Sequence, residues 1–145
     1  MATEEIRQIA HLIRRAGFGA TRDELEAYAK QGYQETVEAL LHPELAPPSL
    51  PDDDLYRRYH VDANHLALID SCQASWIYRM INTKRPLEEK ITLFWHNIFA
   101  TGYTKLNQPY MILRQLDMFR RHGLGSFHSL LLELSKDPAM IFWLD

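Results

Sequence analysis

Apolar side chains recur at intervals of three and four residues along most of this chain, and this spacing is the feature that most restricts its fold. Near the amino terminus, Ile6, Ile9, Ala10 and Ile13 follow it and predict an amphipathic helix over about residues 3–15. No run of useful length alternates apolar and polar residues as a half-buried strand would, and no segment repeats another. The sequence therefore predicts an all-α fold, an irregular domain of about six to seven helices.

Helix start and stop signals place the other helices. Thr21 and Glu24 have the spacing of a capping box and predict a second helix that ends at Gly32. Pro86 suits the first position of a helix that Gly102 can end. Ser126 is a suitable N-cap for another. After the second helix, we expect helices at about residues 34–41, 64–82, 86–101, 109–122 and 126–136.

A stretch rich in proline and aspartate interrupts the helical pattern at residues 43–54. It contains four prolines and three consecutive aspartates, which favour neither a helix nor a sheet. Because the segments on either side are each too small to form a good core alone, we expect a loop within a single helical domain that spans residues 1–145.

The composition is that of a globular protein without a strong charge. Of the 145 residues, 46% are hydrophobic, which is enough for a sizeable core. The formal net charge of -3 and the pI near 6.1 provide no basic field for a phosphate backbone, so nucleic-acid binding is disfavoured. The single cysteine, Cys72, cannot form an internal disulfide, and its apolar neighbours in a helical pattern predict that it is buried.

The two ends of the chain lead to expectations about location and partners. The amino-terminal segment lacks the basic and apolar regions of an export signal, and charges interrupt every apolar run before the roughly 18 residues that a membrane helix needs. A soluble, cytoplasmic protein is therefore the default expectation. The apolar run from Met140 to Leu144 should need covering partners. We therefore expect this chain to be the amino-terminal part of a longer helical protein, with the remaining part as its partner.

The helix expected at residues 86–101 carries a Trp95-His96-Asn97 triplet at its centre. At about 100° per residue, His96 points about 140° away from the centre of an apolar face. That face comprises Leu87, Ile91, Phe94, Trp95 and Ile98. Thr92, four residues before His96, can reach it, whereas Glu89 lies two turns away. His96 therefore suits either a hydrogen-bonded contact between helices or a catalytic or ligand-binding role.

Two other segments of the sequence carry arginines that could contribute to a site with His96. Arg114, Asp117 and Arg121 have the spacing of a positive, negative, positive ladder along one helix face. Arg14 and Arg15 fall at the end of the first expected helix, where cations complement the helix dipole. Each group has a purely structural explanation, and each could instead present guanidinium groups to an anion.

Other kinds of chemistry find little support. None of the seven histidines lies four residues from another on a helix, so no metal site is predicted. Gly17 and Gly19 suggest a tight turn but lack the remaining residues of a phosphate-binding loop. No Gly-x-Ser-x-Gly motif is present and Cys72 is expected to be buried, so no nucleophile is evident. The sequence does not identify a cofactor, so the cofactor is unknown at this point.

The motifs follow one another in a distinctive order. They run from His11-x-x-Arg14-Arg15-Ala-Gly17-Phe18-Gly19-x-Thr21 through Glu89-Lys90-x-Thr92-Leu93-Phe94-Trp95-His96-Asn97-x-Phe99-Ala100-Thr101, Leu113-Arg114-Gln115 and Arg120-Arg121-His122 to Lys136-Asp137-Pro138-Ala139-Met140 with Leu144-Asp145. In this order the chain resembles the bacterial domain of unknown function 1800 (DUF1800) family over nearly its whole length. The resemblance implies further helices after Asp145, and many relatives look exported. Where the family often has a second histidine, this chain has Ile98.

The resemblance transfers positions of interest but no reaction, because none is established for the family. We expect a polar cluster that binds an anionic small molecule or partner group, built from His96, Asn97, Arg14, Arg15, Arg114 and Arg121. An alternative is a hydrolase-like enzyme that uses His96 as acid or base together with residues beyond the carboxyl terminus. A third is a structural interaction module, in which the motifs only specify packing.

Overall fold

The fold is helical throughout the part of the chain that the structure describes. This computed structural model describes residues 2–47, 69–99 and 101–145, and within those ranges it contains nine α-helices, one 3-10 helix and no strand. The predicted all-α class is confirmed. The predicted count of six to seven helices is too low, because the described residues also form two short helices, α7 (Tyr103–Leu106) and α10 (Pro138–Leu144).

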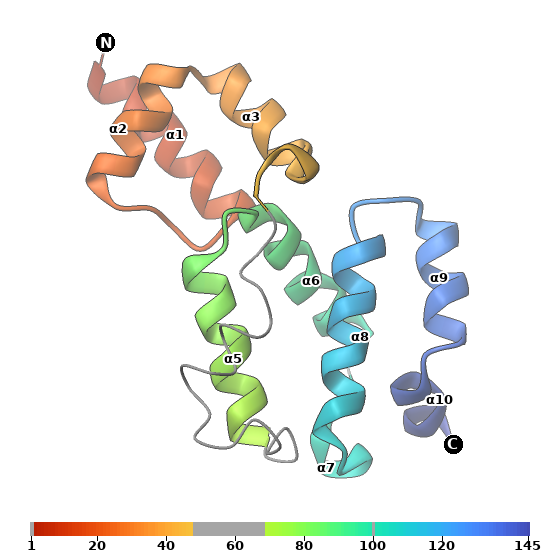
Figure 1. The fold of residues 1–145 in the computed structure, drawn as a ribbon. Helices are drawn as coiled ribbons and strands as arrows, with labels where there is room; N and C mark the ends of the chain where they lie inside the picture. Colours follow the sequence, from red (N-terminus) through yellow and green to blue (C-terminus); the bar gives the residue numbers. More distant parts are fainter. Residues whose placement is uncertain (1, 48–68, 100) are drawn as a thin grey trace.

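The first three helices form a small bundle at one end of the molecule (Figure 1). They are α1 (Ala2–Ala16), α2 (Arg22–Gln31) and α3 (Tyr33–Leu41), close to the expected ranges. α1 packs against both of the others, and Ile9, Ile13 and Leu40 are buried between them. The apolar spacing of the sequence therefore does face a core in this part of the chain.

The predicted capping box is present at the start of α2. The backbone nitrogen of Thr21 donates to Glu24 Oε2 at 2.7 Å, and the nitrogen of Glu24 donates to Thr21 Oγ1 at 3.4 Å. The helix ends where predicted, at Gly32, whose φ of 107° lies in the left-handed region that favours glycine.

The predicted loop at residues 43–54 is described only in its first part. It begins with a 3-10 helix, η1 (Pro43–Leu45), and its residues from 48 onward lie outside the described part. The predicted start of the next helix near residue 64 also lies outside it. That helix is described as α5 (Ile69–Asn82), which ends where expected, and Cys72 is buried on it as predicted.

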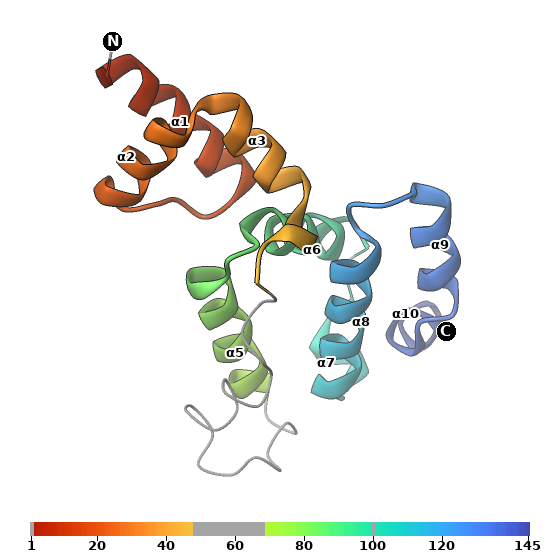
Figure 2. The same ribbon diagram turned by 45° about the horizontal axis from the view of Figure 1, so that its top comes forward.

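The remaining helices pack around α8. They include α6 (Pro86–Ile98), α8 (Pro109–His122) and α9 (Phe127–Ser135). α8 contacts α5, α6, α7, α9 and α10, and its most extensive contact is with α6. Both views show α6 between the first three helices and α8 (Figures 1 and 2). Phe119 of α8 and Leu130 of α9 are the most fully buried side chains of the core formed here.

α6 is oriented differently from what its apolar pattern predicts. Glu89 and Thr92, expected on the polar side, are 0% exposed, whereas Phe94 and Ile98, expected on the apolar face, are 49% and 50% exposed. The helix has neighbours on several sides, and the buried polar side faces α5 and α8, where Glu89 finds charged and hydrogen-bonding partners. Charge pairing therefore outweighs the simple apolar pattern at this helix. α6 also ends at Ile98, with Phe99 as its C-cap, and does not extend to Gly102.

The same helix connects the two groups of helices. Leu87 packs against the core of the first three helices, and Trp95 packs against the core between α8 and α9. This arrangement supports the single-domain interpretation, which remains a prediction. No helix among the described residues is long and apolar enough to cross a membrane.

The last helix leaves part of its apolar run uncovered. Ala139 and Met140 are buried, while Ile141, Phe142 and Leu144 are exposed. The expected continuation into a longer helical protein remains a prediction.

Candidate functional site

His96 lies at the centre of a polar cluster between α5, α6 and α8. The ring of Trp76, from α5, meets the imidazole edge-on, with 5.4 Å between the ring centroids. From α8, the side chain of Gln115 lies near enough to the imidazole to influence its pKa. Three helices therefore fix the position of this histidine.

A chain of buried hydrogen bonds holds Gln115 in turn. Thr101 Oγ1 donates to Gln115 Oε1 at 2.6 Å, and Gln115 Nε2 donates to Asp137 Oδ1 at 2.8 Å. Asp137 is the N-cap of α10 and also accepts from the backbone nitrogen of Met140 at 2.9 Å. Because both ends of the Gln115 amide are engaged, its orientation is fixed, and α10 is linked to the surroundings of His96.

His96 is held in its neutral form. Burial lowers the pKa of its imidazole, and the nearby side chain of Gln115 raises it less than burial lowers it. A neutral imidazole has one nitrogen that donates and one that accepts. Nδ1 is buried and has no hydrogen-bond partner among the described residues. Such a nitrogen is costly to bury unless something pairs with it.

A buried ion pair lies beside this cluster. Glu89 Oε1 accepts from Arg120 Nε at 2.7 Å, and Glu89 Oε2 accepts from Trp76 Nε1 at 3.2 Å. Arg120 also donates to Asp117. Burial acts to lower the pKa of Arg120, but Glu89 and Asp117 outweigh it and raise that pKa. Burial and the nearby Arg120 lower the pKa of Arg79, and Glu89 opposes them.

A pocket of about 180 Å³ opens next to His96. The residues around it include Cys72, Gln73, Trp76, His96, Thr101 and Tyr103. This volume is below the range of about 300–1,000 Å³ that is typical of drug-sized ligands. The pocket therefore suits a very small molecule or one end of a larger one. Burial also raises the pKa of the Cys72 thiol, which makes it a poor nucleophile.

Of the six residues predicted to form the site, the structure places only His96 at this pocket. Asn97 is exposed on α6. Arg14 and Arg15 are exposed at the end of α1, where Arg14 borders an open surface cleft with His11 and Tyr33. The four arginines and Asn97 thus lie outside the buried cluster.

The two arginines of α8 also differ from the predicted ladder. The Arg114 guanidinium lies over the ring of Tyr110, 6.0 Å from its centroid, and Arg121 Nε donates to the backbone oxygen of Asp117 at 3.2 Å. The Asp117 carboxylate pairs with Arg120 instead. Arg114, Asp117 and Arg121 are therefore all exposed on α8, but the Asp117 carboxylate forms its ion pair with Arg120 and with neither arginine of the ladder.

Sequence reasoning missed the buried polar residues around His96. They are Glu89, Thr101, Gln115 and Asp137, together with the partly buried Arg120, and all five are within the motifs quoted above. One signal was present for Gln115, which falls on the same stripe of α8 as Ile112, Leu116 and Phe119. A polar residue on a buried stripe needs a partner, so it marks a polar cluster. Among the described residues, no group of three or more His, Cys, Asp or Glu side chains could hold a metal ion.

Comparison with known proteins identifies the family. Residues 11–145 match the model of the family described as Protein of unknown function (DUF1800). Searches of curated proteins and of solved structures found no significant match. Because the family match covers most of the chain, this protein belongs to the DUF1800 family.

Proposed function

We propose that this domain binds a small molecule, or the acidic end of a larger one, in the pocket beside His96. The observation that carries the proposal is the buried Nδ1 of His96, which lies without a partner among the described residues. Hydrogen bonds with Thr101 and Asp137 fix the amide of Gln115 beside the imidazole. Preorganisation of this kind is typical of binding sites.

The chemistry of the pocket supports an acidic ligand group. None of the residues that line the pocket carries a carboxylate, so an anion entering it would meet no direct repulsion. Gln73 and Tyr103 line the pocket and have side chains that can donate hydrogen bonds. Binding of an anion would favour the protonated imidazole and offset the burial that lowers its pKa. Arg114 and Arg121, which are exposed on α8, would act on such a ligand only at longer range.

A thermal-shift screen with acetate, formate and inorganic phosphate tests the proposal. We expect at least one anion at millimolar concentration to raise the melting temperature of the protein, and His96→Gln to abolish the rise. His128→Gln is the matched control, because His128 is exposed on α9 and its replacement should leave the rise in melting temperature unchanged. If every anion raises the melting temperature of the parent and of His96→Gln by the same amount, the anion binds at another site and the proposal is wrong.

Catalysis is a second candidate function, in which His96 acts as a general base. Burial lowers the pKa of the imidazole and so favours the neutral form that a general base requires. We would assay hydrolysis of small activated esters such as 4-nitrophenyl acetate. A rate that falls in His96→Gln but not in His128→Gln supports catalysis, and equal rates in the three proteins contradict it.

A purely structural role is the third possibility. The bonds from Thr101 and Asp137 to Gln115 join α8 to the segment after α6 and to α10, so they stabilise packing whether or not a ligand binds. In that case His96→Gln should change stability but leave anion binding and ester hydrolysis unaltered.

A further inference from the structure

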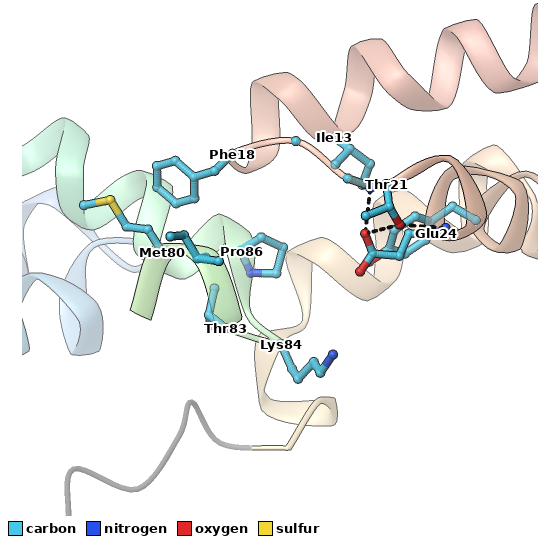
Figure 3. A pocket seen from close by; sticks show the side chains of 12 residues that line it. Ile13, Phe18, Thr21, Glu24, Met80, Thr83, Lys84 and Pro86 are labelled. Carbon is cyan, nitrogen blue, oxygen red and sulfur yellow. Dashed lines mark hydrogen bonds between the residues drawn. The ribbon is translucent and has the colours of Figure 1, made fainter. Parts of the chain in front are cut away.

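A second pocket lies far along α6 from His96, between two turns of the chain. It has a volume of about 330 Å³, at the lower end of the range for small-molecule sites. One wall is the turn between α1 and α2, and the other is the turn between α5 and α6 (Figure 3). The first wall includes Phe18, Gly19, Ala20 and Thr21, which lie in the motif that runs from His11 to Thr21. The function proposed for His96 gives no role to that motif.

The glycines of the motif allow this wall to form. A Cβ on Gly17 would lie 2.9 Å from Cβ of Pro86, so only glycine permits the two turns to approach this closely. Gly19 has a φ of 110°, in the left-handed region that side chains disfavour. Lys90 Nζ lies 5.0 Å from the centroid of the Phe18 ring and helps to hold it. The pocket is therefore shaped by the backbone and is largely formed without a ligand.

The two ends of the pocket differ in chemistry. Figure 3 shows Phe18 and Met80 at one end, and Thr21, Glu24 and Lys84 at the other. A matching ligand has an apolar body and a polar head. Because the polar end carries one carboxylate and one ammonium group, it suits a head that carries both charges.

The Glu24 carboxylate is positioned and ionised. Its Oε2 accepts hydrogen bonds from the backbone nitrogen of Thr21 at 2.7 Å and from Thr21 Oγ1 at 2.9 Å. These bonds are the main reason that the pKa of Glu24 is lowered, and Lys84 lowers it further. Oε1 takes part in no hydrogen bond with the described residues, and no direct ion pair joins Glu24 to Lys84 there. Two opposite charges thus border the pocket without neutralising each other by contact.

We propose that this pocket binds a free α-amino acid with an apolar side chain, whose ammonium group pairs with Glu24 and whose carboxylate pairs with Lys84. The apolar side chain lies against Phe18 and Met80. An amine without a carboxylate would be repelled by Lys84, and an acid without an amine would be repelled by Glu24. The zwitterion satisfies both ends at once.

NMR titration of the full chain with L-leucine tests the proposal. We expect saturable shifts of the backbone amides of residues 18–21 and 83–84 at millimolar leucine. Two analogues isolate the charges: 4-methylpentanoate lacks the ammonium group, and L-leucinamide lacks the carboxylate. Both should bind more weakly than leucine, by about two- to fivefold for each exposed ion pair that is lost.

Single substitutions test whether leucine binds in this pocket. Glu24→Gln keeps the capping box, because glutamine can also fill that position, but it removes the charge. Glu24→Gln and Lys84→Gln should each weaken leucine binding by about two- to fivefold. Glu26→Gln is the matched control on α2, because Glu26 pairs with Arg22 outside the pocket. His96→Gln should leave leucine binding unchanged, so failure of this site and failure of the His96 site are distinguishable.

Three results would overturn the proposal. One is the absence of saturable leucine binding, and a second is binding of either analogue that equals that of leucine. The third is equal binding by the parent protein, Glu24→Gln and Lys84→Gln, which would place leucine elsewhere.

Discussion

Glu89 and Arg120 show how single residues determine the structure around the site. Glu89 is fully buried in α6, and its charge is matched by Arg120 from α8 and by the indole nitrogen of Trp76. Replacing a whole buried ion pair can be neutral, but removing one partner leaves the other charge unpaired. This ion pair, more than apolar contacts, therefore determines which side of α6 faces α8.

Loss of Arg120 should be costly. We predict that Arg120→Met lowers the free energy of unfolding by about 3–5 kcal/mol, because Glu89 would be left buried without its cation. Arg121→Met is the matched control, since Arg121 is exposed and should change stability by no more than about 0.5 kcal/mol. Urea denaturation of both variants measures the difference. Equal losses of unfolding free energy in the two variants would show that Arg120 does not stabilise the buried Glu89.

His96 should make stability depend on pH. Its pKa is lower in the folded protein than the ordinary value of 6.5, so the unfolded chain binds a proton more readily. Unfolding is therefore favoured as the pH falls below about 6.5, and the loss stops at the folded pKa. We predict that the melting temperature of His96→Gln falls less between pH 7 and pH 5.5 than that of the parent. A fall of the same size in both would contradict a lowered pKa for His96.

Helix caps illustrate what can be predicted at the scale of single elements. The Thr21 and Glu24 spacing predicted both the start of α2 and the hydrogen bonds that are found there. Ser126 occupies the N-cap position of α9 as predicted, but its side chain makes no capping bond. Sequence spacing therefore locates a helix start more reliably than it predicts the bonds made there.

The caps differ in their expected contributions. We predict that Thr21→Ala lowers the free energy of unfolding by about 1 kcal/mol, since it removes a capping box. Ser126→Ala should have almost no effect, because no capping bond is lost. Thermal melts of both variants test this, and a larger effect at Ser126 than at Thr21 would contradict the hydrogen bonds described for the two caps.

The whole molecule depends on contacts that join its two groups of helices. Gly17 lies against Pro86, and α6 contacts both α1 and α3. We predict that Gly17→Ala destabilises the protein by about 1–3 kcal/mol, because the added methyl group would press on the rigid ring of Pro86. Gly125→Ala, whose Cβ would meet only His122 O at 3.4 Å, should be tolerated. Equal melting temperatures for the two variants would show that the turns can separate without cost.

Local patterns predicted the helices well, and tertiary pairing explains what they missed. Ile9 and Ile13 face a core as their spacing predicts, and Pro86 and Pro109 begin helices. Glu89 pairs with Arg120, 31 residues away, and Gln115 pairs with Asp137, 22 residues away, and no local pattern specifies such pairs. For the site, the sequence identified His96 but not the buried residues that hold it.

The central claim is that His96 is half-buried beside a pocket and that burial favours its neutral form. The most direct measurement is an NMR titration of the His96 ring nitrogens in the full chain. We predict that His96 titrates below the ordinary value of 6.5, because burial lowers its pKa. A His96 that titrates at or above 6.5 would contradict the claim.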